Sequence, residues 1–136
     1  MARLMCIDFG SRRIGIALTD KLQIISYPYK TIDTKKINFI DEIKNIIARQ
    51  EVERIIIGLP TDVQGEDSIT CKKIREFAQM LKRKVDIPFT FHDESFSSRK
   101  AQQIFHQSGK KLKGHKKDID KIAAAIILQD YLQEQN

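Results

Sequence analysis

The stretch MARLMCIDFGSRRIGIALTD, residues 1–20, decides how this chain is expected to fold. Two apolar runs, at residues 4–9 and 14–19, are separated by a few polar residues, which is typical of antiparallel strands joined by a hairpin. The first run contains Asp8. Burying even an uncharged polar group without a partner costs about 2–7 kcal/mol. We therefore expect Asp8 to lie where another group compensates its charge, and a metal ion is one candidate.

The rest of the chain predicts a mixed sheet covered by helices. The expected strands are residues 4–9, 14–19, 23–28, 54–60 and 89–93. The expected helices begin near residues 37, 68, 98 and 119. Short connections favour an antiparallel meander for the first three strands, and helical crossovers make the later strands parallel. The prediction is an α/β fold with a mixed five-stranded sheet and helices on both faces, the order of elements found in RNase H-like folds.

Length and composition predict one domain, residues 1–136. A chain of 136 residues with 41% hydrophobic content buries roughly two thirds of its unfolded surface. Cys6 and Cys71 lie within apolar patterns and lack zinc-ligand spacing, so we interpret them as reduced core thiols. The chain shows neither a signal peptide nor an apolar run of about 18 residues. We expect a cytoplasmic protein without a membrane partner.

The charge of the chain favours a polyanionic partner. Lysine and arginine outnumber aspartate and glutamate by 24 to 18, which gives a formal net charge of +6. The densest basic block is GKKLKGHKK at residues 109–117. Its composition fits a solvated loop and a phosphate-contacting loop equally. The candidate phosphate contacts are Lys110, Lys111, Lys113, Lys116 and Lys117.

Acidic residues stand at the ends of predicted elements. Asp93 and Glu94 close the last strand, and because adjacent strand residues face opposite ways, at most one of them can point toward Asp8. In the final helix, Asp118 lies on the polar side and suits an N-cap. Asp120 falls on the buried side, where a carboxylate is anomalous unless it meets a cation.

Convergence of Asp8, Glu94 and Asp120 would create a site made of oxygen ligands. Mg²⁺ and Mn²⁺ prefer such ligands, and two ions can activate a water and stabilise the leaving oxygen of a phosphodiester. Ordinary alternatives remain, because Asp8 before a glycine also fits a turn and an acidic strand end also keeps an edge soluble. Arg12 and Arg13, in the first hairpin, are candidates for holding a substrate phosphate or are solvated charges.

Four segments together resemble the YqgF (RuvX) family of RNase H-like proteins. They are IDFGSRRIGIALTD, IIIGLP, HDESFSS and DKIAAAIILQDYL, and they extend from the first strand to the last helix. The resemblance implies a Mg²⁺- or Mn²⁺-dependent nuclease in which Asp8, Glu94 and Asp120 match the catalytic, metal-binding acids, with Asp93 as a supporting acid. Ser95 departs from the pattern, since the family usually has arginine there. Arg99, about one helical turn further on, is the candidate replacement for substrate binding.

The family resemblance implies two substrates. Its members are described as pre-16S rRNA processing nucleases and as Holliday junction resolvases. A resolvase needs two active sites and hence a symmetric homodimer, whereas RNA processing suits a monomer or a homodimer. We therefore expect an endonuclease that processes the 5′ end of pre-16S rRNA during ribosome biogenesis, with structured RNA favoured over branched DNA. A resolvase and a non-catalytic RNA-binding factor are the alternatives.

Overall fold

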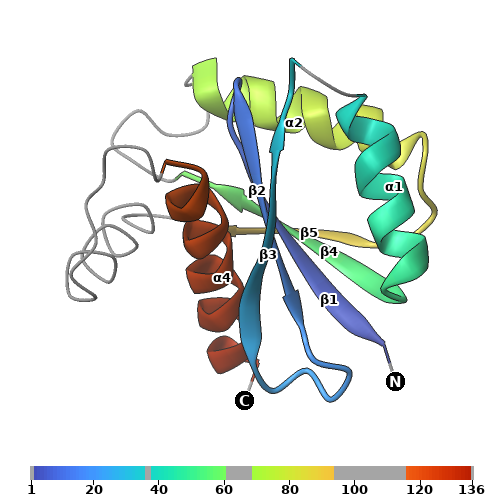
Figure 1. Ribbon diagram of the computed structural model, residues 1–136, viewed down its shortest axis with the longest axis vertical. Coiled ribbons are helices and arrows are strands. Elements are labelled where there is room, and N and C mark those ends of the chain that lie inside the picture. The colour runs from blue at the N-terminus through green and yellow to red at the C-terminus, as the bar shows by residue number, and fades with distance from the viewer. Residues whose placement is uncertain (1, 36–37, 61–68, 94–115, 136) are drawn as a thin grey trace.

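The computed structural model describes residues 2–35, 38–60, 69–93 and 116–135, with the backbone alone at Lys116 and Lys117. Five strands form one sheet in the order β3-β2-β1-β4-β5, with β1 at its centre (Figure 1). The strands are β1 (Arg3–Phe9), β2 (Arg13–Thr19), β3 (Ser26–Asp33), β4 (Val52–Leu59) and β5 (Phe89–Asp93).

The strand directions confirm the predicted mixed sheet. β1 pairs antiparallel with β2, and β2 pairs antiparallel with β3. β4 runs parallel to both β1 and β5. The carboxyl ends of β1, β4 and β5 therefore lie along one edge of the sheet, where ligands of such α/β sheets bind.

Helices cover both faces of the sheet (Figure 1). Helix α1 (Phe39–Arg49) and helix α2 (Ile69–Lys82) pack on one face, and helix α4 (Lys116–Glu134) packs on the other. Strand alternation divides β1 between the two faces: Met5 and Ile7 join the α1/α2 core, whereas Leu4 and Cys6 join the α4 core. By the same alternation, Asp8 belongs to the α4 face.

Strand β3 begins later than predicted. The sequence predicts a strand over residues 23–28, but β3 spans Ser26–Asp33 because residues 20–25 form a turn. In that turn, Asp20 Oδ1 accepts hydrogen bonds from the backbone N–H groups of Ile24 and Ile25, and Gln23 has φ 58°. These two hydrogen bonds lower the pKa of Asp20. The turn leaves Leu22, Ile24 and Ile25 exposed.

The last helix begins earlier than predicted. Lys116 is its first residue, so Asp118 lies inside the first turn instead of at the N-cap. Lysine is a good helix former and an acid in the first turn interacts favourably with the helix dipole, which explains the extension. The predicted short helix at 98–107 lies outside the described residues. Cys6 and Cys71 are both buried and form no disulfide.

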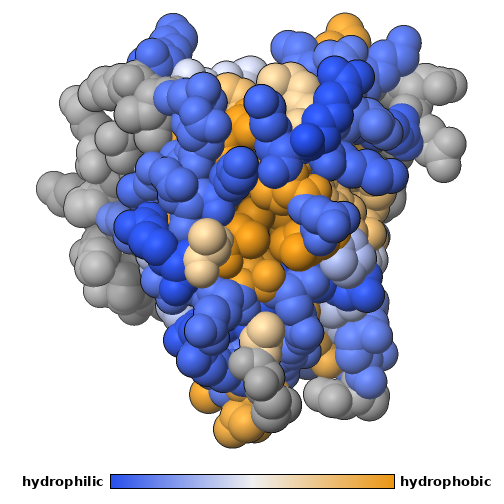
Figure 2. Space-filling model, turned by 90° about the vertical axis from the view of Figure 1, so that its right-hand side faces the viewer, coloured by the Kyte–Doolittle hydropathy of each residue, from blue (hydrophilic) through white to orange (hydrophobic). Residues whose placement is uncertain are grey.

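A groove separates α1 from α2 on their face of the sheet. It has a volume of about 350 Å³ and is lined by Asn38, Ile40, Asp41, Met80, Arg83 and Lys84. Figure 2 views the molecule from the side of α1, and hydrophilic side chains surround an apolar centre there. Basic residues at the end of α2 therefore border this side of the molecule.

Candidate functional site

The carboxylate that the sequence marks as anomalous is paired with an arginine. Arg13 Nε donates a hydrogen bond to Asp120 Oδ2 at a distance of 2.6 Å. The two side chains are 28% and 26% exposed. Asp120 therefore meets the cation that its place on the helix requires, and that cation belongs to the chain itself. A hydrogen bond between two charged groups is stronger than a neutral one, so this pair holds the start of α4 on β2.

Gly15 brings the backbone of α4 close to the sheet beside this pair. A Cβ atom at Gly15 would lie 2.1 Å from the backbone oxygen of Asp120. Only glycine permits such an approach. Gly15 also pairs directly with Asp8 across β1 and β2. Opposed residues of an antiparallel pair share one face of the sheet, so Asp8 faces α4, the helix that carries Asp120.

The first hairpin places the two arginines differently. Gly10 N–H donates to the backbone oxygen of Arg13 at 3.0 Å, which closes the turn after Asp8. The side chain of Arg13 is then directed to Asp120. Arg12 is exposed, and its backbone oxygen accepts a hydrogen bond from Thr34 N–H. Of the two candidate phosphate contacts, Arg12 is the one on the open surface.

Asp93 lies on the other face of the sheet. Its neighbour His92 faces α4, because the His92 ring packs edge-on against Tyr131 and its Nδ1 lies 3.6 Å from Glu134 Oε2. Alternation along β5 directs Asp93 away from α4, and Asp93 is exposed. Asp93 therefore does not join Asp8 and Asp120, which agrees with the expectation that at most one of residues 93 and 94 faces the site.

Several predicted site residues cannot be placed. Glu94, Ser95, Arg99, Lys110, Lys111 and Lys113 lie outside the described residues. Only the backbone of Lys116 and Lys117 is described, at the start of α4. Within the described ranges, no three acidic, histidine or cysteine side chains form a group that could hold a metal ion. The described part of the proposed cluster thus consists of Asp8 and Asp120.

Sequence reasoning missed the Arg13–Asp120 pair and the role of Gly15. A signal for both exists in β2, because Arg13, Gly15 and Ala17 alternate with large isoleucines and leucine. A strand with one charged residue followed by small residues on the same face indicates close packing of a helix there. Ala17 indeed joins the α4 core.

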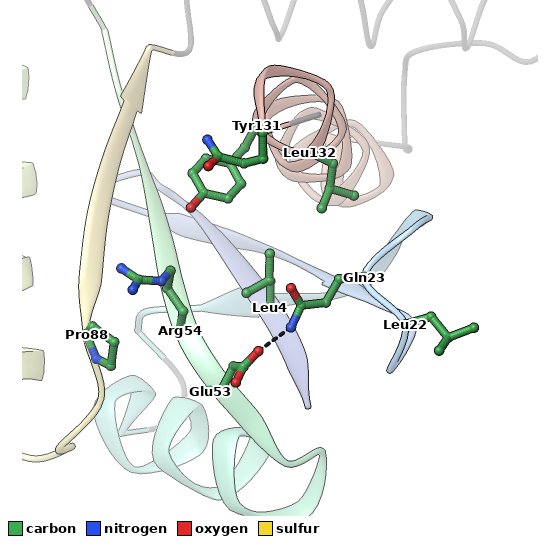
Figure 3. A pocket seen from close by; sticks show the side chains of 9 residues that line it. Leu4, Leu22, Gln23, Glu53, Arg54, Pro88, Tyr131 and Leu132 are labelled. Carbon is green, nitrogen blue, oxygen red and sulfur yellow. Dashed lines mark hydrogen bonds between the residues drawn. The ribbon is translucent and has the colours of Figure 1, made fainter. Parts of the chain in front are cut away.

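A separate pocket lies at the opposite end of the sheet (Figure 3). Its volume is about 540 Å³, and Leu4, Arg54 and Tyr131 are among its lining residues. Gln23 donates to Glu53 across its rim, and Arg54 Nη1 donates to Thr90 Oγ1 at 3.0 Å. These polar side chains have partners within the protein. The acidic residues lie at the other edge, so this pocket is not part of the candidate site.

Comparison with known proteins identifies the family. The profile of RuvX, described as Holliday junction resolvase, matches residues 2–134. The chain belongs to the RuvX family. A relative from Maridesulfovibrio salexigens named "Putative pre-16S rRNA nuclease" is 38% identical over 131 residues, covering 96% of this chain and 97% of the relative. A relative of the same name from Bacteroides fragilis is 40% identical over 136 residues, covering 98% and 97% of the two chains.

A solved structure supports the fold of this RuvX chain. The structure of T. thermophilus RuvC in complex with Holliday junction substrate matches with a TM-score of 0.59 and 11% identity. The match covers 99% of this chain and 96% of that one. The predicted RNase H-like α/β fold is thereby confirmed. The family and the names of the relatives support a nuclease, a hydrolase acting on nucleic acid.

The helices were also compared with the requirements of a membrane span. Within the part of the chain that the structure describes, no helix is both long enough and apolar enough to cross a bilayer.

Proposed function

We propose that this RuvX chain is a metal-dependent endonuclease that processes the 5′ end of pre-16S rRNA in the cytoplasm. The observation that carries the proposal is that Asp8 and the backbone of Asp120 both lie next to Gly15, on the α4 face near the carboxyl edge of the sheet. Two acidic residues from distant parts of the chain thus belong to the edge at which ligands of such sheets bind. The curated relatives named for pre-16S rRNA favour RNA as the substrate.

The residues fit a hard divalent cation. Asp8 and Asp120 offer carboxylate oxygens, the ligands that Mg²⁺ and Mn²⁺ prefer. We assign Glu94 as the third ligand, because it matches an acidic position of the family and Asp93 faces away from α4. A bound Mg²⁺ or Mn²⁺ would supply an activated water and charge stabilisation for the leaving oxygen of the phosphodiester.

The chain's own residues orient this donor set. Arg13 Nε donates to Oδ2 of Asp120, which restrains the orientation of that carboxylate and leaves Oδ1 as the oxygen that we assign to the metal. The close contact at Gly15 fixes the helix backbone that carries Asp120. Such rigid support is what a metal site requires for its geometry. Arg13 is thus a positioning residue in this proposal.

Phosphate contacts complete the proposed site. We assign Arg12 to a phosphate near the site because it is exposed at the hairpin next to Asp8. Arg99 and the lysines of residues 110–117 are proposed as further contacts on their charge alone. Such contacts supply affinity without choosing sequence. RNA shape is therefore the proposed basis of recognition.

The second candidate function is a Holliday junction resolvase. It is favoured by the family description and by the fold shared with RuvC. Cleavage of a four-way junction requires two sites related by symmetry, hence a homodimer. RNA processing needs no such symmetry, and for this reason we place it first.

The test is cleavage of end-labelled substrates by the purified protein with Mg²⁺ or Mn²⁺. Precursor 16S rRNA, unrelated single-stranded RNA and four-way DNA junctions are compared for wild type, Asp8→Asn and Asp86→Asn. Asp86 is an exposed carboxylate in the connection before β5, at the other end of the sheet, so it is a matched control. We expect precursor cleavage by wild type and Asp86→Asn, and none by Asp8→Asn.

Other outcomes would replace the proposal. Cleavage of junctions alone would establish the resolvase. Tight RNA binding without cleavage of any substrate would indicate a non-catalytic RNA-binding factor. Equal cleavage by Asp8→Asn and wild type would overturn the assignment of Asp8.

A further inference from the structure

Helix α2 and the two residues that follow it carry most of the excess positive charge of the protein. Residues 72–84 contain six basic side chains and one acidic side chain, Glu76, a net charge of +5 against +6 for the whole chain. The exposed basic residues, which we call the α2 ridge, are Lys72, Lys73, Lys82, Arg83 and Lys84. No ion pair joins any of them to a carboxylate of the described residues.

The geometry of α2 separates this charge from the core. Cys71, Ile74, Phe77, Ala78 and Leu81 form its buried side. At 100° per residue, Lys72 and Arg83 lie within about 20° of each other on the side opposite to these residues. They are separated by eleven residues, which corresponds to about 16 Å along the axis. The outward side therefore carries cations near both ends, with the exposed Glu76 between them, and the two ends are far enough apart to contact phosphates several nucleotides apart.

The other helices do not share this imbalance. In α1, Asp41 and Glu42 balance Lys44 and Arg49. Helix α4 contains Asp118, Asp120, Asp130 and Glu134 against three lysines. The basic strip is thus a property of α2 and is not an average of the surface. Lysines gathered along one helix face are the usual footprint of nucleic-acid binding, whereas protein interfaces are depleted in lysine.

The α2 ridge lies at the same end of the sheet as the acidic site. Phe9, which follows Asp8, stacks on Phe77 of α2 with ring centroids 4.4 Å apart. Figure 1 shows α2 across the end of the sheet at which β2 begins, and β2 begins with Arg13. Lys72 and Lys73 precede Phe77 by about one turn. A nucleic-acid backbone held along α2 therefore reaches the edge of the sheet at which β1 ends, on the face opposite to Asp8.

We propose that the α2 ridge is a second nucleic-acid interface that holds a double-stranded arm of the RNA substrate by its phosphates while the scissile strand lies at Asp8 and Asp120. This inference rests on the proposed function, because it assumes an RNA substrate at the acidic site. It adds a surface on the opposite face of the sheet from α4. The RNA would thus contact both sides of the sheet edge.

The test measures binding separately from cleavage. Wild-type protein with divalent ions chelated is titrated against a labelled RNA hairpin at several salt concentrations. The variant Lys72→Gln/Lys73→Gln/Arg83→Gln removes three charges from the ridge. We expect about tenfold or greater weakening at low salt and a salt slope smaller by about 2, because each lost phosphate contact removes 0.7–0.9 from the slope.

Two further variants control the test. Lys21→Gln/Lys44→Gln/Arg49→Gln removes the same charge from exposed residues away from the ridge, and we expect nearly wild-type binding. Lys72→Arg/Lys73→Arg/Arg83→Lys keeps the charge and should keep the affinity, which separates electrostatics from folding. If Lys21→Gln/Lys44→Gln/Arg49→Gln weakens RNA binding as much as Lys72→Gln/Lys73→Gln/Arg83→Gln does, the α2 ridge is not an RNA interface. The nuclease proposal would not be affected by that result.

The failure of the nuclease proposal has a different signature. If the wild-type protein shows no salt-dependent RNA binding, both proposals fail together. If it binds four-way DNA junctions through the ridge but not RNA, the ridge is a DNA interface and the RNA assignment is overturned.

Discussion

Arg13 Nε lies 2.6 Å from Asp120 Oδ2, and this contact joins residues 107 positions apart in the chain. It connects the first residue of β2 with the first turns of α4, on the edge of the sheet where Asp8 also lies. One ion pair therefore both fastens the last helix and orients a carboxylate of the candidate site. Substitutions at Arg13 and Asp120 separate the two consequences.

Replacement of Asp120 by asparagine tests the role of its charge. We expect Asp120→Asn to lower the cleavage rate by about a hundredfold or more. Mutation of residues that only hydrogen-bond to metal ligands already lowers metal affinity or activity by about 10- to 100-fold, and Asp120 is proposed as a ligand itself. RNA binding should change little, because phosphate contacts supply the affinity. Cleavage rates and binding curves on the same RNA measure both. Unchanged cleavage with a shifted melting temperature would make Asp120 purely structural.

Removal of Arg13 tests the ion pair as a stabilising contact. We expect Arg13→Ala to lower the free energy of unfolding by about 1 kcal/mol, since the pair is charge-assisted but about a quarter exposed. For a chain of this size this corresponds to a melting temperature lower by roughly 4 °C. A double-mutant cycle with Asp120→Asn isolates the pair. Additive effects of the two substitutions would contradict a direct interaction in solution.

The affinity for a metal ion tests whether Arg13 does more than stabilise the fold. If Arg13 positions Asp120, Arg13→Lys should be more stable than Arg13→Ala. Its affinity for Mn²⁺, measured by calorimetry, should nevertheless be about 10-fold weaker than that of the wild type. A lysine cannot reproduce the fixed geometry of a guanidinium group. Equal Mn²⁺ affinity for wild type, Arg13→Lys and Arg13→Ala would remove the positioning role.

Gly15 is expected to tolerate no side chain. Its Cβ atom would lie 2.1 Å from the Asp120 backbone oxygen, so α4 must move away from β2 in Gly15→Ala. We expect a loss of about 1–3 kcal/mol of stability, the usual cost of overpacking, together with loss of cleavage. Urea unfolding measures the first. Gly15→Ala with a wild-type unfolding midpoint would contradict the close approach of α4.

The turn at Asp20 predicts how stability depends on pH. Hydrogen bonds from Ile25 and Ile24 lower the pKa of Asp20 in the folded protein below its unfolded value of about 3.9. The contribution of ionised Asp20 is therefore complete above the unfolded pKa and is lost as the pH falls through the folded pKa. Asp20→Asn, which does not titrate, should lose less stability below about pH 4. Parallel acid-unfolding curves for the two proteins would contradict the assignment.

Patterns within the sequence predicted much of the fold, because alternation and helical periodicity are local. Asp8, Gly15 and the apolar residues of β1 and β2 were placed on strands from their spacing alone. The bounds of β3 were predicted wrongly, since the turn at residues 20–25, held by Asp20, takes up the apolar residues Ile24 and Ile25. Alternation also predicted that Asp93 and Glu94 face opposite ways, and the structure assigns Asp93 to the side away from Asp120.

The sequence by itself determined that Asp120 would stand on the packed side of the last helix and would need a cation. It could not decide which cation, because that depends on how α4 crosses the sheet. In the tertiary structure that cation is Arg13. Gly15, two residues further along β2, lets the backbone of α4 approach the strand closely, and this approach brings Asp120 to Arg13. Helical period is a property of neighbouring residues, whereas an ion pair across 107 residues exists only once the sheet and helix have packed.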